Sequence, residues 1–265
     1  MASIFDSHAH YDDEAFASDR DELLAGLHAG NVCGILNASA SLASSRMSVQ
    51  LAERYPFVWA AVGIHPEEAA HTTAEDIEEL RRLYDHPRVV AVGEIGLDYH
   101  YEDSCPREKQ LEVFEAQLKL AKELDAPVVV HDREAHEDIL RLLQAFRPRG
   151  VVHCFSGSTE MLRELIKIGM YIGLGGAVTF KNARRPVEAA AAVPADRLLL
   201  ETDAPYMAPV PCRGKRCDSG MIDHTAARIA QVRGITMDQL LEQTRQNACQ
   251  LFSIDCPAND CPAND

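Results

Sequence analysis

The chain has 265 residues, of which 46% are hydrophobic and 25% are charged, a composition that excludes a disordered chain and suits one large or two small globular domains. Its formal net charge of −15 argues against a broad basic surface for coating nucleic acid, so an anionic substrate would have to be held locally by metal ions and a few arginines. No segment resembles a signal peptide or approaches the roughly 18 apolar residues that span a bilayer, so we expect a cytoplasmic protein without membrane contact.

The eight cysteines occur without Cys-x-x-Cys pairs, in a chain too large to need disulfide bonds for stability. We therefore interpret them as mostly reduced thiols. Cys212 and Cys217 have a spacing that can hold zinc, but no second pair accompanies them, and two free thiols are the favoured interpretation.

Short apolar runs rich in β-branched residues alternate with segments of helical periodicity along the chain. The predicted strands cover Ser3–Asp6, Cys33–Asn37, Val58–Gly63, Val89–Ile95, Pro127–Val130, Gly150–Val152, Met170–Leu174 and Leu198–Leu200. The predicted helices cover Asp19–His28, Leu42–Arg54, Ala74–Tyr84, Pro106–Leu124, Glu134–Ala145, Thr159–Ile168, Ala183–Ala192, His224–Val232 and Met237–Phe252.

Alternation of strands and helices indicates parallel strands, and nearly continuous apolar runs indicate strands covered on both faces. Eight such repeats predict an α/β fold, a (β/α)8 TIM barrel, in one domain over residues 1–254. A doubly wound sheet is the alternative, although no Gly-x-Gly-x-x-Gly follows the first strand. Residues 255–265 repeat Cys-Pro-Ala-Asn-Asp and are expected to form a flexible tail.

The first strand leads into the sequence Asp6-Ser7-His8-Ala9-His10. Because side chains alternate along a strand, we expect Asp6, His8 and His10 to project from one side. Two neighbouring imidazoles can clamp a metal ion, although eleven histidines make a close pair unremarkable by itself.

Further candidate ligands close the later strands, and in a TIM barrel these ends meet at one rim. They are His65, Glu94, His131, His153 and Asp203. Each one alone would ordinarily be a surface or hydrogen-bonded residue. Together, His8, His10, Glu94, His131, His153 and Asp203 supply six nitrogen and oxygen donors, enough for two divalent ions that share a bridging carboxylate.

These residues belong to motifs through which the chain resembles the TatD-type metal-dependent deoxyribonucleases of the amidohydrolase superfamily. In order, the motifs are Asp6-Ser7-His8-Ala9-His10, Gly63-Ile64-His65-Pro66, Gly93-Glu94-Ile95-Gly96-Leu97-Asp98-Tyr99, His131-Asp132-Arg133, His153-Cys154-Phe155-Ser156-Gly157, Glu201-Thr202-Asp203-Ala204-Pro205-Tyr206 and Arg213-Gly214-Lys215-Arg216. The resemblance implies a TIM barrel, two metal ions and hydrolysis of DNA phosphodiester bonds, with 3'-5' exonuclease action on single-stranded DNA as the expected activity.

The resemblance also implies a role for each residue. It places His8, His10 and Asp203 on the first metal, His131 and His153 on the second, and Glu94 between the two. It makes Asp6, His65, Arg133 and Glu201 supporting residues or substrate contacts. After Arg216 the family usually continues Asn-Glu-Pro, whereas this chain has Cys217-Asp218-Ser219, so substrate contacts from this loop are in doubt.

Two bound divalent ions activate a bridging water and need no covalent nucleophile, and Asp203 is our candidate general base. Arg133, Lys215 and Arg216 are candidate grips for phosphate oxygens, with ordinary solvated charges as the alternative for the last two. The resemblance implies magnesium or manganese in activity, while the histidine-rich donor set suits bound zinc. We expect DNA as the substrate and no obligate protein partner.

Two other functions compete with a nuclease. A different amidohydrolase would cleave a cyclic amide, a lactone or a phosphoester of a small molecule, but such relatives commonly use a modified lysine where this chain has Glu94. A non-enzymatic metal-binding scaffold is the other alternative, and a complete ligand set with room for water argues against it.

Overall fold

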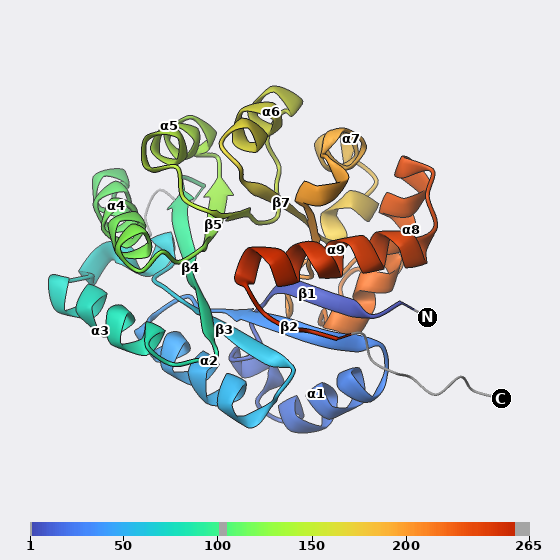
Figure 1. The fold of residues 1–265 in the computed structure, drawn as a ribbon, viewed down its shortest axis with the longest axis horizontal. Coiled ribbons are helices and arrows are strands. Elements are labelled where there is room, and N and C mark those ends of the chain that lie inside the picture. Colours follow the sequence, from blue (N-terminus) through green and yellow to red (C-terminus); the bar gives the residue numbers. More distant parts are fainter. Residues whose placement is uncertain (1, 101–104, 258–265) are drawn as a thin grey trace.

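The fold is described from a computed structural model that covers residues 2–100 and 105–257. Within these ranges, eight parallel strands follow one another around a barrel in sequence order (Figure 1). They are β1 (Ile4–Ala9), β2 (Val32–Ala38), β3 (Val58–Val62), β4 (Val89–Asp98), β5 (Val128–Arg133), β6 (Gly150–Val152), β7 (Tyr171–Leu174) and β8 (Leu198–Leu200). The predicted (β/α)8 TIM barrel is therefore confirmed.

Helices surround the strands on the outside of the barrel (Figure 1). They are α1 (Arg20–Ala29), α2 (Leu42–Arg54), α3 (Ala74–Tyr84), α4 (Arg107–Glu123), α5 (His136–Phe146), α6 (Thr159–Lys167), α7 (Arg184–Ala192), α8 (Ile222–Arg233) and α9 (Met237–Phe252). Short 3-10 turns lie in the connections: η1 (Glu14–Phe16), η2 (Pro66–His71), η3 (Gly176–Thr179), η4 (Ala195–Arg197) and η5 (Ser219–Met221).

Local sequence signals explain where several helices begin. Thr73 accepts a hydrogen bond from the amide of Asp76, whose carboxylate accepts one back from the Thr73 amide, and this capping box starts α3. Thr236 and Gln239 form the same box at the start of α9. Each box satisfies amides that have no partner inside their own helix.

The barrel closes where the last strand meets the first. Ala9 and Ala204 form a parallel bridge just beyond the end of β8, and the amide of His10 donates to the Ala204 carbonyl at 2.8 Å. The amide of Asp203 in turn donates to the carbonyl of His8 at 3.0 Å. Closure therefore fixes the backbone that carries these candidate ligands.

Four strands are longer than the sequence predicted. β1 continues to Ala9 and β2 spans Val32–Ala38, while β4 continues to Asp98 and β5 to Arg133 because these two strands stay paired. His8 and His131 thus lie inside strands rather than after them. Hydrogen bonding to a neighbouring strand holds each backbone segment at a fixed position.

The ends of the barrel differ in how they are filled. At the amino ends of the strands, α9 lies across the barrel (Figure 1) and seals a buried apolar cluster inside it. That cluster includes Phe5, Leu36, Trp59, Val129, Leu199, Leu251 and Phe252. The carboxyl ends of the strands are therefore the end at which a site can open.

The start of the expected flexible tail is packed against the barrel. Cys256 is 2% exposed, and its thiol donates to the carbonyl of Cys33 at 3.3 Å. Cys256, which belongs to the segment 255–265 that the sequence interprets as a flexible tail, thus packs beside Phe5 and Gly34. Residues 258–265, with Cys261, lie outside the described residues.

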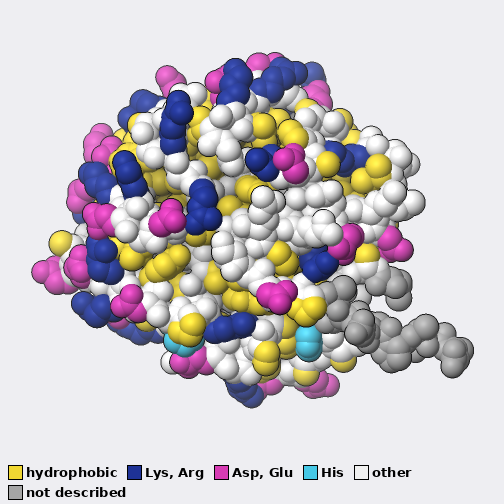
Figure 2. Space-filling view, in the orientation of Figure 1, with side chains coloured by type: hydrophobic (Ala, Val, Ile, Leu, Met, Phe, Trp, Pro, Cys, Tyr) yellow, Lys and Arg dark blue, Asp and Glu magenta, His cyan; other side chains and the backbone are white. Residues whose placement is uncertain are grey.

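The face shown in Figure 2 carries lysines and arginines mixed with aspartates and glutamates, separated by small apolar areas. A mixture of both signs is typical of a solvated surface. Within residues 2–100 and 105–257, no helix has the length and apolar content needed to cross a membrane. The seven cysteines in these ranges are free thiols.

Candidate metal centre

A hollow of about 540 Å³ opens where the strands end at their carboxyl termini. The candidate ligands converge on it from six strands and the segments that follow them. Its lining includes His10, His65, Glu94, Asp98, His131, Arg133, His153, Asp203, Tyr206 and Met207. Sequence motifs that lie far apart in the chain are thus assembled at one rim, as expected for a TIM barrel.

Glu94 occupies the middle of the cluster, and its two carboxylate oxygens face different pairs of histidines. Oε1 lies 2.8 Å from both His131 Nδ1 and His153 Nε2. Oε2 lies 3.3 Å from His8 Nε2 and 3.5 Å from His10 Nε2. With only 3% of its side chain exposed, this carboxylate can join two cation sites side by side.

Asp203 approaches the histidine pair on the Oε2 side. Its Oδ1 lies 3.4 Å from His10 Nε2 and 3.7 Å from His8 Nε2, and the two imidazole nitrogens are 3.1 Å apart. Asp203 has φ of 70°, in the left-handed region that non-glycine residues seldom adopt. Such strain is held in place only where the surroundings fix it, and it concentrates at functional sites.

His65 also reaches the cluster. Its Nε2 lies 3.7 Å from Glu94 Oε1, and the ligand atoms of His65, Glu94 and His131 lie within 4.8 Å of one another. The sequence assigned His65 only a supporting or substrate-contacting role. The structure places its imidazole nitrogen close enough to Glu94 and His131 for His65 to be a candidate ligand as well.

Second hydrogen bonds fix which nitrogen of two imidazoles is free to bind a cation. His10 Nδ1 lies 2.8 Å from the carbonyl of Ala38, which can only accept, so Nδ1 carries a hydrogen and Nε2 is the nitrogen that faces the cluster. His131 Nε2 lies 3.0 Å from Asp98 Oδ2, so Nδ1 is the nitrogen that faces Glu94. Such partners are typical of metal-bound histidines.

The electrostatics of the cluster favour a cation. Burial alone would lower the pKa of His10, but the carboxylates of Asp203 and Glu94 raise this pKa to about 10. Burial and the neighbouring His153 lower the pKa of His8 to about 4. Against its burial, His153 and His8 hold the pKa of Glu94 well below its usual range, so this carboxylate remains charged.

The donor set fits divalent metal ions. The imidazole nitrogens and carboxylate oxygens of the cluster lie 2.8 to 3.7 Å from one another. In two of these contacts, His8 with His10 and His131 with His153, one imidazole nitrogen faces another. At most one nitrogen of such a neutral pair can donate, whereas a cation between them satisfies both. Imidazoles with carboxylates suit zinc, manganese, iron or nickel. Three groups of donors could each hold an ion: His8–Glu94–His153, His8–His10–Asp203 and His65–Glu94–His131.

Asp6 does not face the cluster, and the expectation that it would project beside His8 and His10 is wrong. Its carboxylate accepts hydrogen bonds from the hydroxyls of Thr202 and Ser219, each at 2.7 Å. The pairing of β1 with β2 shifts register between Asp6 and Ala9, which breaks the simple alternation of side chains. Fully buried, Asp6 supports the backbone beside Asp203 and cannot touch a substrate.

Glu201 supports the other side of the cluster. Its Oε1 accepts from the amide of Cys154 and lies 3.8 Å from His153 Nδ1. Burial raises the pKa of Glu201 to about 8. Because Glu201 is 1% exposed, it acts behind His153 rather than on a substrate.

The candidate phosphate grips divide into two groups. Arg133 lies at the mouth of the hollow, with its side chain 43% exposed and Nη1 4.0 Å from Asp98 Oδ2. Lys215 and Arg216 do not line this hollow. Arg216 instead pairs with Asp19 at 2.5 Å and lies over the ring of Phe16. Arg216 thus fastens the loop after β8 to the residue that precedes α1.

Two residues that the sequence left without a role belong to this site. Asp98 lies in the quoted Glu94-to-Tyr99 motif, but only the extension of β4 reveals that its carboxylate orients His131. Tyr206 has 54% of its surface exposed at the mouth, with its ring centre 6.5 Å from that of His10. Tyr206 could have been identified from the sequence, because it ends the Glu201-to-Tyr206 motif and an aromatic side chain beside a catalytic rim can contact a ligand.

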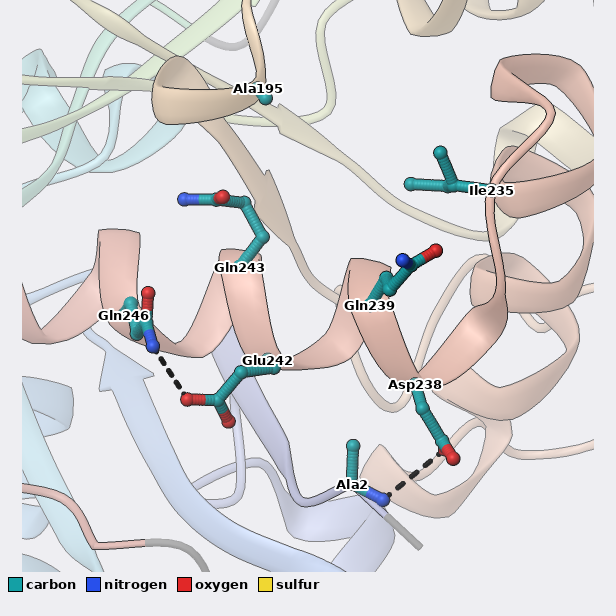
Figure 3. Close-up of a pocket in the computed structure, with 8 residues that line it drawn as sticks. All are labelled: Ala2, Ala195, Ile235, Asp238, Gln239, Glu242, Gln243 and Gln246. Carbon is teal, nitrogen blue, oxygen red and sulfur yellow. Dashed lines mark hydrogen bonds between the residues drawn. The ribbon is translucent and has the colours of Figure 1, made fainter.

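A larger hollow of about 730 Å³ lies away from this rim, along α9 (Figure 3). Figure 3 shows its lining of amide and carboxylate side chains from one helix face, with Asp238 bonded to the amide of Ala2 and Glu242 bonded to Gln246. Its acidic groups thus already have partners within the protein. No metal-ligating group of three was found among these lining residues.

Comparisons with known proteins match nearly the whole chain to metal-dependent hydrolases and nucleases of one family. The family model described as "TatD related DNase" matches residues 5–253. The chain is 39% identical over 254 residues to "Uncharacterized metal-dependent hydrolase YabD" of Bacillus subtilis, covering 95% of this chain and 99% of the relative. It is 35% identical over 260 residues to "3'-5' ssDNA/RNA exonuclease TatD" of Erwinia tasmaniensis, covering 95% and 100%.

A solved structure supports this relationship. The crystal structure of YJJV, a TatD homolog from Escherichia coli, superimposes with a TM-score of 0.88 at 31% identity, covering 95% of this chain and 98% of that one. Sequence, fold and ligand cluster therefore agree, and this chain, a metal-dependent hydrolase, belongs to the TatD-related DNase family.

Proposed function

We propose that this protein removes nucleotides from the 3' end of single-stranded DNA by metal-dependent hydrolysis of phosphodiester bonds. The proposal depends on one observation: each carboxylate oxygen of Glu94 faces a different pair of histidines, so that this residue lies between two candidate cation sites. Relatives named as 3'-5' exonucleases on single-stranded DNA and RNA support the choice of substrate.

In this proposal, His8, His10 and Asp203 hold one divalent ion, His131 and His153 hold a second, and Glu94 joins them. When bound, such ions would lower the pKa of a water molecule and offset negative charge on the phosphodiester oxygens. Asp203, 20% exposed beside the first position, would accept a proton from the attacking water on its carboxylate. Asp98 holds the imidazole of His131 through a hydrogen bond, and Glu201 lies behind His153 with 3.8 Å between Oε1 and Nδ1.

The mouth of the hollow suits a nucleotide. Arg133 offers a guanidinium that can pair with phosphate oxygens, and the exposed ring of Tyr206 offers a surface on which a base can stack. Both lie at the rim beyond the candidate ligands. We propose magnesium or manganese as the activating ion, with zinc as an ion that the imidazoles would retain on purification.

The test is digestion of a single-stranded 20-mer by purified protein with Mn²⁺ or Mg²⁺, with one sample labelled at the 5' end and one at the 3' end. We expect a ladder of shortened products from the 5' label, early release of labelled mononucleotide from the 3' label, and no reaction with excess chelator. Glu94→Gln should reduce the rate at least about 10³-fold, equivalent to about 4 kcal/mol, because it removes the charge between both positions.

Glu112→Gln is the matched control, because Glu112 is exposed and pairs with Lys109 on the surface of α4, away from the metal hollow. It should digest DNA at the normal rate. Near-normal activity of Glu94→Gln would contradict the bridging role, and hydrolysis of small esters or cyclic amides without any digestion of DNA would favour the other amidohydrolase activities.

A further inference from the structure

A second hollow on the same side of the barrel follows strand β7. Its volume is about 490 Å³, and it lies where η3 leads into α7, beside α8. In Figure 1, α7 and α8 are neighbours on the outside of the barrel. We call it the β7 groove, and its lining consists of Phe180, Lys181, Asn182, Ala183, Arg184, Val187 and Arg228.

The β7 groove is positively charged in a strongly acidic protein. Lys181, Arg184 and Arg228 contribute three cations, while none of the described lining residues is acidic and the chain carries a net charge of −15. One nearby carboxylate, Glu188, pairs with Arg184 at 2.8 Å. A local excess of positive charge against such a background attracts an anion.

The backbone contributes less to this positive charge than the side chains do. Helix α7 begins at the groove, and its N-cap residue Ala183 has no side chain to accept a hydrogen bond from the first-turn amides. Amides at a helix start carry partial positive charge and favour anions such as phosphate. In α7, however, the Arg184 amide already donates to the Asn182 carbonyl at 2.8 Å, and Pro186 has no N–H. The backbone therefore adds little, and the lysine and arginine side chains account for most of the attraction for an anion.

The β7 groove is joined to the metal hollow by one loop. Met207 lines the metal hollow, and its carbonyl packs so closely on Gly176 of η3 that a side chain there would overlap it. Arg213 connects this loop to the β7 groove. It donates to the carbonyl of Ala208 at 3.3 Å, and its guanidinium lies 4.1 Å from the ring centre of Phe180, which lines the groove. A positive side chain therefore marks the path between the two hollows.

We propose that the β7 groove binds backbone phosphates of a single-stranded polynucleotide at nucleotides beyond the bond that is cut. This inference rests on the proposed nuclease function. The metal hollow is lined by several carboxylates, including Asp12, Asp13 and Glu67, and so repels the remaining phosphates of a long strand. The β7 groove provides the positive surface on which those phosphates lie, and it gives longer strands tighter binding than dinucleotides.

The test measures binding of a 5'-fluorescein-labelled dT12 by fluorescence anisotropy in the presence of Mn²⁺. Phosphorothioate linkages at its 3' end protect the strand during the measurement. The variant is Lys181→Gln with Arg228→Gln. We expect its Kd at 50 mM salt to rise about tenfold, and the slope of log Kd against log salt to fall by about 1.4, because two phosphate contacts to a single strand are lost. The kcat/KM for a thymidine dinucleotide should stay within twofold of the normal value.

Two control variants separate charge from structure. Arg163→Gln with Lys167→Gln removes two cations from the surface of α6, where they pair with Glu160 and Glu164, and should leave Kd unchanged. Lys181→Arg with Arg228→Lys keeps the charge and should bind dT12 within twofold of normal. An unchanged Kd in the glutamine variant, or no binding of dT12 by the normal protein, would overturn the proposal. Failure of the nuclease function would appear separately, as intact DNA and dinucleotide in Mn²⁺ whatever the Kd.

Discussion

Burying the charged carboxylate of Glu94 lowers the stability of the fold, but it places a negative charge where the candidate site needs one. A carboxylate that is 3% exposed is costly to bury unless charges of opposite sign surround it. Here the partners are imidazoles, which compensate the charge only partly, so the residue attracts cations. The strained backbone of Asp203 is another local cost at the same rim.

At this scale the sequence predicted the cluster but not its details. His8, His10, Glu94, His131, His153 and Asp203 could be found because each follows or ends an apolar run, and the fold brings such positions to one rim. The direction of Asp6 could not be found, because it depends on a register shift in β1. The same holds for Lys215 and Arg216, whose loop is placed by contacts with residues far away in the chain.

The ion pair between His136 and Asp132 makes stability depend on pH. The two atoms lie 2.8 Å apart, and the hydrogen bond to Asp132 raises the pKa of His136 despite partial burial. The stabilisation is therefore fully present below the unfolded pKa of about 6.5 and is lost as pH rises through the higher folded value. We expect His136→Gln to lower the free energy of unfolding by about 0.5–1 kcal/mol at pH 6 and by less at pH 9.

Urea unfolding of both proteins at the two pH values measures this effect. Both proteins contain the same histidine and carboxylate cluster at the rim. Its titration therefore changes both free energies of unfolding equally and does not affect the difference between the two proteins. A difference between the two proteins that is as large at pH 9 as at pH 6 would show that the pair contributes through packing rather than charge.

At the level of elements, the close approach of β4 to β5 positions half of the candidate metal centre. Gly96 has φ of 148°, and a side chain at this position would overlap the carbonyl of His131 on the neighbouring strand. The sequence predicted where both strands begin, from their apolar runs. It did not predict that they continue to Asp98 and Arg133, because Gly96 interrupts the apolar run of β4 and the last three residues of β5 are polar; pairing between the two strands keeps both ends extended.

Gly96→Ala should therefore destabilise the protein by at least about 3 kcal/mol, since it adds backbone strain to a steric overlap. Gly26→Ala is the matched control: Gly26 lies within α1, and nothing lies within 4 Å of the added methyl group. That change should stabilise the protein by about 0.5–1 kcal/mol, as alanine favours a helix interior. Thermal unfolding followed by circular dichroism compares the three proteins, and equal stability of Gly96→Ala and normal protein would refute the steric argument.

At the scale of the whole molecule, the barrel separates stability from chemistry. The amino ends of the strands enclose an apolar cluster sealed by α9, whereas the carboxyl ends carry the buried charges. From the order of the elements, the sequence predicted the site at the carboxyl ends of the strands, but not the apolar cluster at the other end. It could not predict that the chain remains packed as far as Cys256, because that depends on a gap beside Phe5 that only the assembled barrel creates.

A consequence for the whole molecule is that metal binding should stabilise the fold. The ligands come from β1, β4, β5 and the segments after β3, β6 and β8, so an ion that binds only the folded state ties together most of the barrel. At a free metal concentration of 100 times Kd, linkage adds about 2.7 kcal/mol. For a chain of this size, that corresponds to a rise in Tm of about 5–10 °C. Calorimetry with excess Mn²⁺ and with excess chelator measures the shift, which Glu94→Gln should largely abolish because it removes the shared carboxylate. Equal Tm values of the normal protein under both conditions would exclude a metal centre of the proposed affinity.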